Sequence, residues 1–188
     1  MDLKLRLQEK INKIESLIIN PTVFQGQKLL ELSQDLKGVL DRGSKVAFVG
    51  NGGSAAEAMH LAAEFTGKCV KPHRPLDVIC LNESQSALTA IGNDYGQEFV
   101  FSRLVEAHLK KGDVLIALST SGKSANVVRA IEVANKLGVK TLLWMGEFQE
   151  ESNAAQVWKV PSADTPRIQE IHLMWGHIVA ELIEEMLD

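Results

Sequence analysis

Four hydroxyl side chains lie close together in the segment 119–124, and their arrangement suggests a site for an anion. The segment reads Ser119-Thr120-Ser121-Gly122-Lys123-Ser124, after a buried-strand pattern at 113–117 and before a helical pattern that begins near Ala125. The first backbone N–H groups of a helix lack partners, and the helix dipole favours negative charge at that end. We therefore predict that Ser119, Thr120, Ser121 and Ser124 form a phosphate cradle.

A second glycine-rich turn, Gly50-Asn51-Gly52-Gly53-Ser54, stands between a predicted strand at 45–49 and a helix that extends to about Phe65. Dinucleotide-binding folds have such a turn, but the acidic residue expected about 20 residues later is not clearly present. Residues 117–124 similarly approach a nucleotide-binding P-loop, except that Ala117 replaces its first glycine. Taken together, the two turns favour a phosphosugar-binding domain over either nucleotide-binding site.

The helix after the first turn carries His60 and Glu64, four residues apart and therefore on one face. The two side chains can share a substrate or a metal ion, or they can form an ordinary surface pair. The neighbouring positions are strongly apolar, which favours a specific role for the polar ones. Both interpretations remain open from the residues alone.

The C-terminal helix has polar residues among its apolar ones: Gln169, Glu170, His172 and His177. Gln169 and His177 are eight residues apart, about 12 Å along the helix axis. Each alone is typical of an interface. Because two side chains so far apart barely reach one atom, an ion that binds both is easier to build from two subunits.

Strand-like and helical segments alternate along the chain, which predicts βαβ units and a parallel sheet covered on both faces. In such sheets ligands bind outside the carboxyl ends of the strands, where both turns lie. We expect one doubly wound α/β domain over 1–188, flavodoxin-like, with a mostly parallel five-stranded sheet. The expected helices are 3–19, 22–42, 53–65, 84–92, 97–109, 125–137 and 166–187, with a turn at 92–96, and the expected strands are 45–49, 76–81, 114–118, 140–145 and 155–160.

Composition limits the classes of partner. The 188 residues carry a formal net charge of −4, with a pI of about 5.8, and neither value suggests binding to nucleic acid or to a membrane surface. Cys69 and Cys80 form no disulfide framework, and no signal peptide or membrane span is apparent. We expect a soluble cytoplasmic protein. Residues 1–42 are expected to pack on the core and to lie at an oligomer interface, because their helices have more apolar surface than one sheet needs.

Four motifs in this order resemble the sugar-isomerase (SIS) domain family, and within it the bacterial phosphoheptose isomerases. They are the turn at 50–54, Gly92-Asn93-Asp94, the segment 118–124, and Arg167-Ile168-Gln169-Glu170-Ile171-His172. The resemblance runs from about residue 25 to the C-terminus. It implies isomerisation of sedoheptulose 7-phosphate to D-glycero-D-manno-heptose 7-phosphate on the way to lipopolysaccharide heptoses. It also implies a homotetramer with active sites between subunits, and a zinc ion.

The resemblance also assigns roles. Substrate contacts are implied for Asn51, Gly52, Gly53, Ser54, Glu64, Asn93, Asp94, Ser119, Thr120, Ser121, Ser124 and Gln169, and metal ligation for His60, Glu64, Gln169 and His177. Glu64 would be the catalytic base and His177 the second proton-transfer group. Zinc would polarise the carbonyl, but a Glu64 that binds zinc tightly is a poorer base, so the two roles compete.

The chain differs from the isomerases in one segment, and an alternative function stays open. The isomerases have a glycine-rich turn after the fourth strand, where this chain has the acidic segment 145–151. A non-catalytic SIS protein that binds the replication initiator, or an isomerase of another sugar phosphate, is the alternative. That regulator lacks the glutamate and the last histidine, whereas this chain has Glu64 and His177.

Overall fold

The computed structural model describes residues 2–24, 26–148 and 151–187. Its centre is a five-stranded sheet in the order β2-β1-β3-β4-β5, and every pair of neighbours is parallel. The strands are β1 (Val46–Gly50), β2 (Val78–Cys80), β3 (Val114–Leu118), β4 (Lys140–Met145) and β5 (Gln156–Lys159). The expected doubly wound sheet is thus confirmed, with β2 and β5 shorter than predicted.

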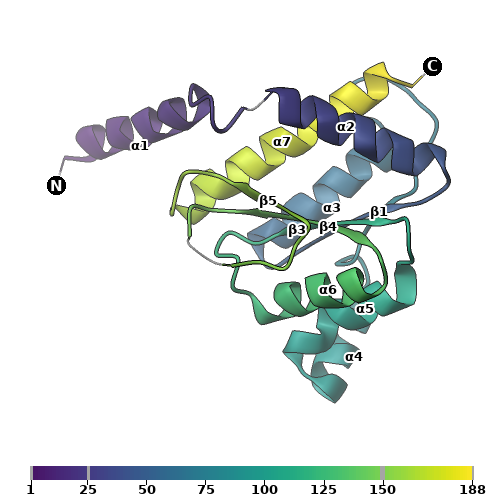
Figure 1. Ribbon diagram of the computed structural model, residues 1–188. Coiled ribbons are helices and arrows are strands. Elements are labelled where there is room, and N and C mark those ends of the chain that lie inside the picture. Colours follow the sequence, from purple (N-terminus) through teal and green to yellow (C-terminus); the bar gives the residue numbers. More distant parts are fainter. Residues whose placement is uncertain (1, 25, 149–150, 188) are drawn as a thin grey trace.

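Helices cover both faces of this sheet (Figure 1). The described helices are α1 (Leu3–Ile18), α2 (Gly26–Asp41), α3 (Gly53–Thr66), α4 (Gln85–Tyr95), the 3-10 turn η1 (Gln97–Phe99), α5 (Val100–His108), α6 (Ala125–Lys136) and α7 (Thr165–Glu185). Helices α2, α3 and α7 lie on one side of the sheet and α5 and α6 on the other (Figure 1).

The three central strands, β1, β3 and β4, are buried on both faces because their side chains alternate between two apolar clusters. On β1, Val46 and Phe48 pack towards α2, α3 and α7, whereas Ala47 and Val49 pack towards α5 and α6. All five residues of β1 and of β3 are buried. This explains why their sequences read as continuous apolar runs.

The prediction of a turn at 92–96 is wrong for residues 92–95, which belong to helix α4. Helix α4 begins at Ser84, whose hydroxyl accepts the Ala87 N–H, and it continues through Asn93 and Asp94 to Tyr95. Gly96, with φ of 104°, then ends it. Gly92 lies inside the helix, and its missing side chain leaves room for the Gln97 amide.

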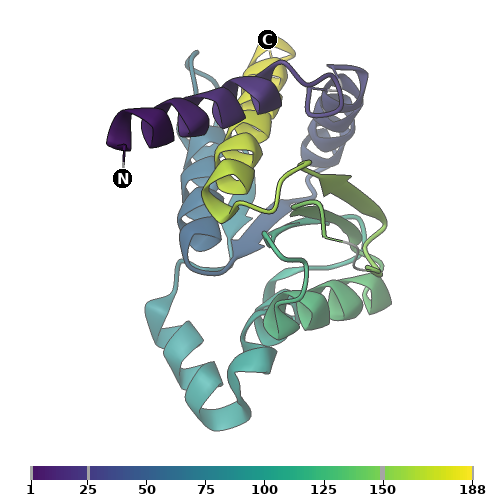
Figure 2. The same cartoon turned by 90° about the vertical axis from the view of Figure 1, so that its left-hand side faces the viewer.

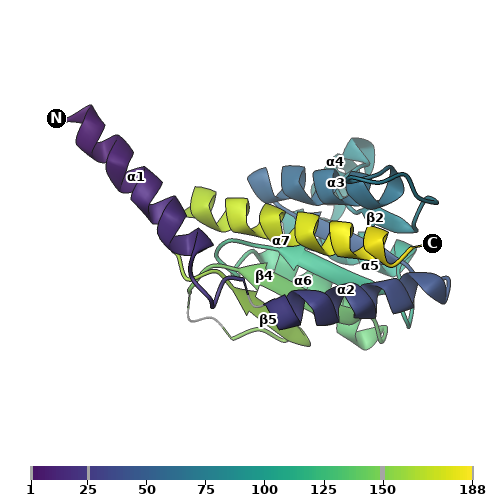
Figure 3. The ribbon, with the colours of Figure 1, turned by 90° about the horizontal axis from the view of Figure 1, so that it is seen from above.

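Helices α1 and α4 lie outside the two layers. Helix α4 lies at the far end of the α5 and α6 layer (Figures 1 and 2), and none of its residues is buried. Helix α1 projects from the body (Figures 1 and 3), although α2 packs on α7 as expected for the N-terminal helices. Exposed apolar residues of α1 are Leu3, Leu5, Leu7, Ile11 and Ile18.

None of the described helices combines the length and apolar character that a membrane crossing requires. The longest, α7, packs on both α2 and α3. Its buried residues include Ile171, Trp175 and Val179, which join the larger apolar cluster. The role of α7 is therefore to hold the α-helical layer on one face of the sheet.

Helices α3 and α7 approach closely at Gly176. A Cβ atom at this position would lie well within van der Waals distance of the Leu61 side chain on α3. Leu61 is completely buried and has little room to move. The absence of a side chain at Gly176 therefore sets the distance between the two helices.

We predict that Gly176→Ala lowers the free energy of unfolding by about 1–2 kcal/mol, because overpacking the interface outweighs the better helix propensity of alanine. Gly38→Ala in α2 is the matched control. Its new Cβ would meet only the mobile end of Arg42, so it should be neutral or slightly stabilising. Urea unfolding of both variants measures this. Equal effects of the two substitutions would contradict the packing argument.

Candidate active site

The first glycine turn places the start of α3 against α7. Gly52 has φ of 55°, in the left-handed region that favours glycine. A Cβ on Gly53 would collide with the side-chain amide of Gln169 from α7. The same amide donates a weak hydrogen bond to Ser54 Oγ at 3.4 Å. Gly53 is therefore required by the close passage of Gln169.

The end of β1 is fixed by Asn82, which follows β2 and is 8% exposed. Its Oδ1 accepts the Gly50 N–H at 3.2 Å, and its Nδ2 donates to the Gly50 carbonyl at 2.9 Å. Both main-chain groups at the start of the turn are thereby satisfied. The sequence analysis missed Asn82, and an asparagine directly after a strand was the available signal.

The two predicted ligand loops are joined by a pair of asparagine side chains. Asn51 in the first turn donates to Asn126 near the start of α6, and Asn126 donates back to Asn51, both at 2.9 Å. Asn126 was not among the predicted site residues. The pair holds the glycine turn beside the hydroxyl-rich segment, although the residues are 75 apart in sequence.

The hydroxyl-rich segment 119–124 folds as a compact turn that leads into α6. The Gly122 N–H donates to the carbonyl and to the hydroxyl of Ser119, at 3.1 and 3.2 Å. Ser124 is the N-cap residue of α6, but its hydroxyl makes no capping bond. The Ser124 hydroxyl therefore lies beside the first N–H groups of α6. This is the arrangement that binds phosphate at a helix N-terminus.

The loop after β4 contacts this segment. Gly146 donates its N–H to the Thr120 carbonyl at 2.9 Å, and Glu147 donates to Ser162 at 3.0 Å. A Cβ on Gly146 would collide with Ile168. The divergent segment 145–151 is therefore anchored at its first residues, while residues 149–150 lie outside the described part of the chain.

His60, Glu64 and His177 come together on the α3–α7 interface. The Nε2 atoms of His60 and His177 are 2.9 Å apart, and His60 Nε2 is 3.4 Å from Glu64 Oε1. One ligand atom from each residue lies within 4.8 Å of the other two. The Glu64 side chain is 17% exposed and that of His60 is 48% exposed, so the cluster opens towards solvent on one side.

His177 from another helix joins His60 and Glu64, which favours a specific role over a simple surface pair. Two imidazole nitrogens and one carboxylate oxygen are a ligand set that zinc accepts in catalytic sites. Without an ion, the short nitrogen–nitrogen distance requires one histidine to donate a proton to the other. The cluster is therefore suited either to bind a cation or to move a proton.

The other predicted residues are placed differently. Gln169 lies against Gly53 and Ser54, two turns before His177 on α7, and has no described contact with the histidine cluster. Asn93 and Asp94 are exposed on α4, where Asn93 donates to the Asp94 carboxylate at 2.7 Å. Within the described residues of one chain, α4 packs on α5 and η1 rather than on α3 or α7.

Two buried ionisable groups lie behind the site. Glu57 on α3 is 8% exposed, its oxygens lack hydrogen-bond partners among the described residues, and burial raises the pKa of its carboxyl to about 7. Burial lowers the pKa of the His172 imidazole on α7 to about 3. Burial therefore favours the neutral form of each group. The sequence analysis did not assign a role to Glu57.

The comparisons with known proteins identify the family of the chain. A sequence model described as the SIS domain matches residues 11–142. A phosphoheptose isomerase of Nitratiruptor sp. is 54% identical over 145 residues, 75% of this chain and 76% of that protein. That of Aquifex aeolicus is 42% identical over 187 residues, 95% of this chain and 97% of that protein.

Solved structures give the same result. The structure of a phosphoheptose isomerase from Neisseria gonorrhoeae covers 98% of this chain and 100% of its own, with a TM-score of 0.87 and 32% identity. A doubly wound sheet with a hydroxyl-rich cradle, matched over most of its length, places the chain in the SIS domain family. Within that family the chain belongs to the phosphoheptose isomerases.

We predict that the Asn51–Asn126 pair contributes about 1 kcal/mol of coupling to the free energy of unfolding, since each residue provides one of two neutral hydrogen bonds. A double-mutant cycle with Asn51→Ala and Asn126→Ala, followed by thermal or urea unfolding, measures it. Strictly additive effects would mean that the pair does not hold the two loops together.

We predict that Glu57→Gln reduces the pH dependence of stability between pH 5 and pH 8. The folded pKa of Glu57 is raised, so its contribution is complete below the unfolded value near 4.5 and is lost as the pH rises towards 7. Between pH 5 and pH 8, the free energy of unfolding of Glu57→Gln should change by about 1–3 kcal/mol less than that of the original chain. Glu106→Gln, at an exposed position of α5, is the control. Identical pH profiles for the Glu57 variant and the original chain would refute this burial effect.

Proposed function

We propose that the chain isomerises sedoheptulose 7-phosphate to D-glycero-D-manno-heptose 7-phosphate. The observation that carries this proposal is the convergence of Glu64, His60 and His177 in a domain that also has a preformed phosphate cradle. The relatives named phosphoheptose isomerase support it. We further propose that the reaction belongs to the synthesis of heptose precursors for surface glycans and takes place in the cytoplasm.

The phosphate end of the substrate would bind at the start of α6, with Ser119, Thr120, Ser121 and Ser124 as hydrogen-bond partners. Backbone N–H groups and hydroxyls can hold a dianion there without a fixed positive charge. Asn51, Gly52, Gly53, Ser54 and Gln169 would line the sugar, because they meet at the neighbouring turn. Asn93 and Asp94 are proposed contacts too, although α4 lies apart from the cluster within one chain.

The chemistry moves a carbonyl from C2 to C1. The Glu64 carboxylate would remove a proton from C1, and the C1–H electron pair would form the double bond of an enediolate. Return of a proton to C2 and loss of the proton from the C1 hydroxyl would complete the aldose. His177 would carry the proton between the two oxygens, because its imidazole can donate at one nitrogen and accept at the other.

A zinc ion fits the side chains that the structure brings together. His60, Glu64 and His177 would hold it, since their donor atoms already converge. When bound, zinc supplies Lewis-acid polarisation of the carbonyl and stabilises the enediolate charge. Gln169 is also proposed as a ligand. Because it lies two turns from His177, its amide would reach the ion most easily from a second subunit.

A homotetramer is proposed as the working form. Helix α1 exposes several leucine and isoleucine side chains away from the body of the chain, and such a surface is typical of association. The open side of the His60 cluster would then face a neighbouring subunit. We propose that residues 1–42, through α1 and α2, form part of that interface.

We predict that the chain converts sedoheptulose 7-phosphate in deuterated water with deuterium incorporated at C2, as detected by NMR. Glu64→Gln should lower kcat/KM by at least about a thousandfold, because it removes the base and keeps the shape. The matched control, Glu132→Gln at an exposed position of α6, should retain activity. Circular dichroism establishes that each variant is folded.

The alternatives make different predictions for the same assay. A non-catalytic SIS protein would give no aldose even with zinc added. An isomerase of another sugar phosphate would convert a different ketose, lose that activity in Glu64→Gln, and leave sedoheptulose 7-phosphate unchanged. Either result would contradict the proposed substrate.

A further inference from the structure

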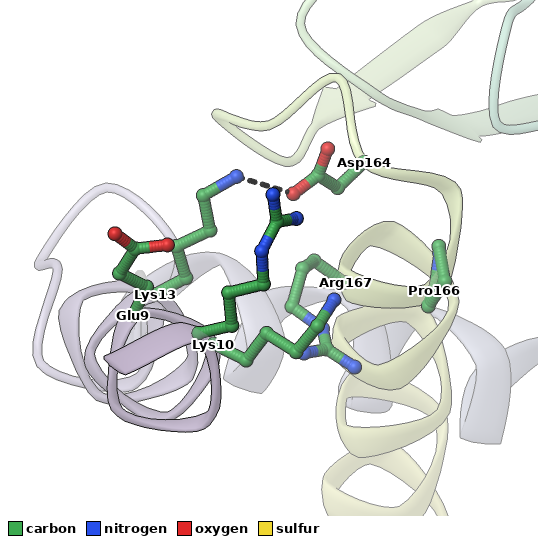
Figure 4. Close-up of a pocket in the computed structure, with 7 residues that line it drawn as sticks. Glu9, Lys10, Lys13, Asp164, Pro166 and Arg167 are labelled. Carbon is green, nitrogen blue, oxygen red and sulfur yellow. Dashed lines mark hydrogen bonds and ion pairs between the residues drawn. The ribbon is translucent and has the colours of Figure 1, made fainter. Parts of the chain in front are cut away.

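A cavity of about 260 Å³ lies between α1 and the start of α7, outside the site described above. Figure 4 shows Lys10 and Lys13 of α1 facing Asp164 and Arg167 across it. The six charged residues that line the cavity are Arg6, Glu9, Lys10, Lys13, Asp164 and Arg167. Four of them are cations and two are anions.

The carboxylate nearest to the cations is already engaged. Asp164 accepts a hydrogen bond from the Lys13 ammonium group at 2.7 Å, and this bond lowers the pKa of the Asp164 carboxyl. Arg167 donates through Nη2 to Glu170, which lies outside the cavity. Of the two carboxylates that line the cavity, Asp164 is thus already paired, and Glu9 is the other.

Two cations of α1 remain without a partner. Among residues 2–24, 26–148 and 151–187, no carboxylate lies within ion-pair distance of Arg6 or Lys10. The two residues are one helical turn apart and line the same cavity. Arg167 is 17% exposed at its side chain, and its buried Nε atom has no hydrogen-bond acceptor. Two cations without an ion pair and the partly paired Arg167 thus line one cavity from two helices.

With four cations and two carboxylates, the cavity carries a net positive charge that would attract an added anion. Arginine forks bind phosphate oxygens in two-point fashion, and lysine adds a compact charge. The N-terminus of α7 lies at the same position and favours an anion as well. A volume of about 260 Å³ is large enough for a diphosphate or a phosphorylated small molecule.

We infer that the cavity between α1 and α7 binds a small phosphate-bearing anion, separately from the cradle at 119–124. The two sites share no lining residue. The anion would bridge Arg6 and Lys10 on α1 to Arg167 on α7. It would therefore also hold α1 against the body, to which the described α1 side chains are tied by the Lys13–Asp164 ion pair and the buried Leu17.

Titration calorimetry with inorganic pyrophosphate tests the inference on the full chain. The chain carries Ser119→Ala and Ser124→Ala, so that the cradle does not contribute the heat. We expect one saturable site, and at least about tenfold weaker binding when Arg6→Ala and Lys10→Ala are added. Lys4→Ala, a cation of α1 outside the cavity, should leave binding unchanged. Pyrophosphate should also slow tryptic cleavage within α1, but not in the Arg6 and Lys10 variant.

Three results would overturn the inference. They are no saturable binding, binding that survives the Arg6 and Lys10 substitutions, and equal loss in the Lys4 control, which would indicate only general attraction to a basic helix. The first result is also expected if carboxylates of a second copy fill the cavity. Because activity is not measured in this experiment, its outcome is independent of whether the chain is an isomerase.

Discussion

The close approach of α3 and α7 is the constraint on which the candidate site depends. It is made possible by two glycines, Gly53 beneath the Gln169 amide and Gly176 against Leu61. Any side chain at either position would separate the helices. Because His60 and Glu64 lie on one helix and His177 on the other, the distance between the helices decides whether their donor atoms converge. The site is therefore a product of helix packing and not of a loop.

The sheet is the second element that positions the candidate site. Parallel strands bring the turns after β1 and β3 to one edge, and side-chain amides then fix their positions. Asn82 holds the end of β1, and Asn126 ties Asn51 to the start of α6. The hydroxyl-rich segment is thus tied to the turn that leads into α3, the helix that carries His60 and Glu64 of the histidine cluster. Two buried ionisable groups, Glu57 and His172, lie on the same two helices as the cluster, α3 and α7.

Much of this arrangement could be predicted from local sequence. The alternation of apolar strands and helices gave the sheet and its parallel pairing, and the glycine and serine turns were placed correctly at strand ends. At Gly92 the prediction failed locally, because Gly96 and not Gly92 ends α4. Elsewhere it failed where the cause lay far away in the chain. The Asn51–Asn126 pair and the contact of Gly176 with Leu61 join segments whose proximity only the folded chain provides.

The most direct test of this account is the affinity for zinc, measured by calorimetry on folded Gly176→Ala with Gly38→Ala as the control. The substitution leaves all three proposed ligands in place and changes only the spacing of α3 and α7. We expect affinity to fall by about 10–100-fold, the range found when the support of metal ligands is disturbed. The control should bind as the original chain does. Unchanged zinc affinity in folded Gly176→Ala would contradict the claim that helix packing assembles the site.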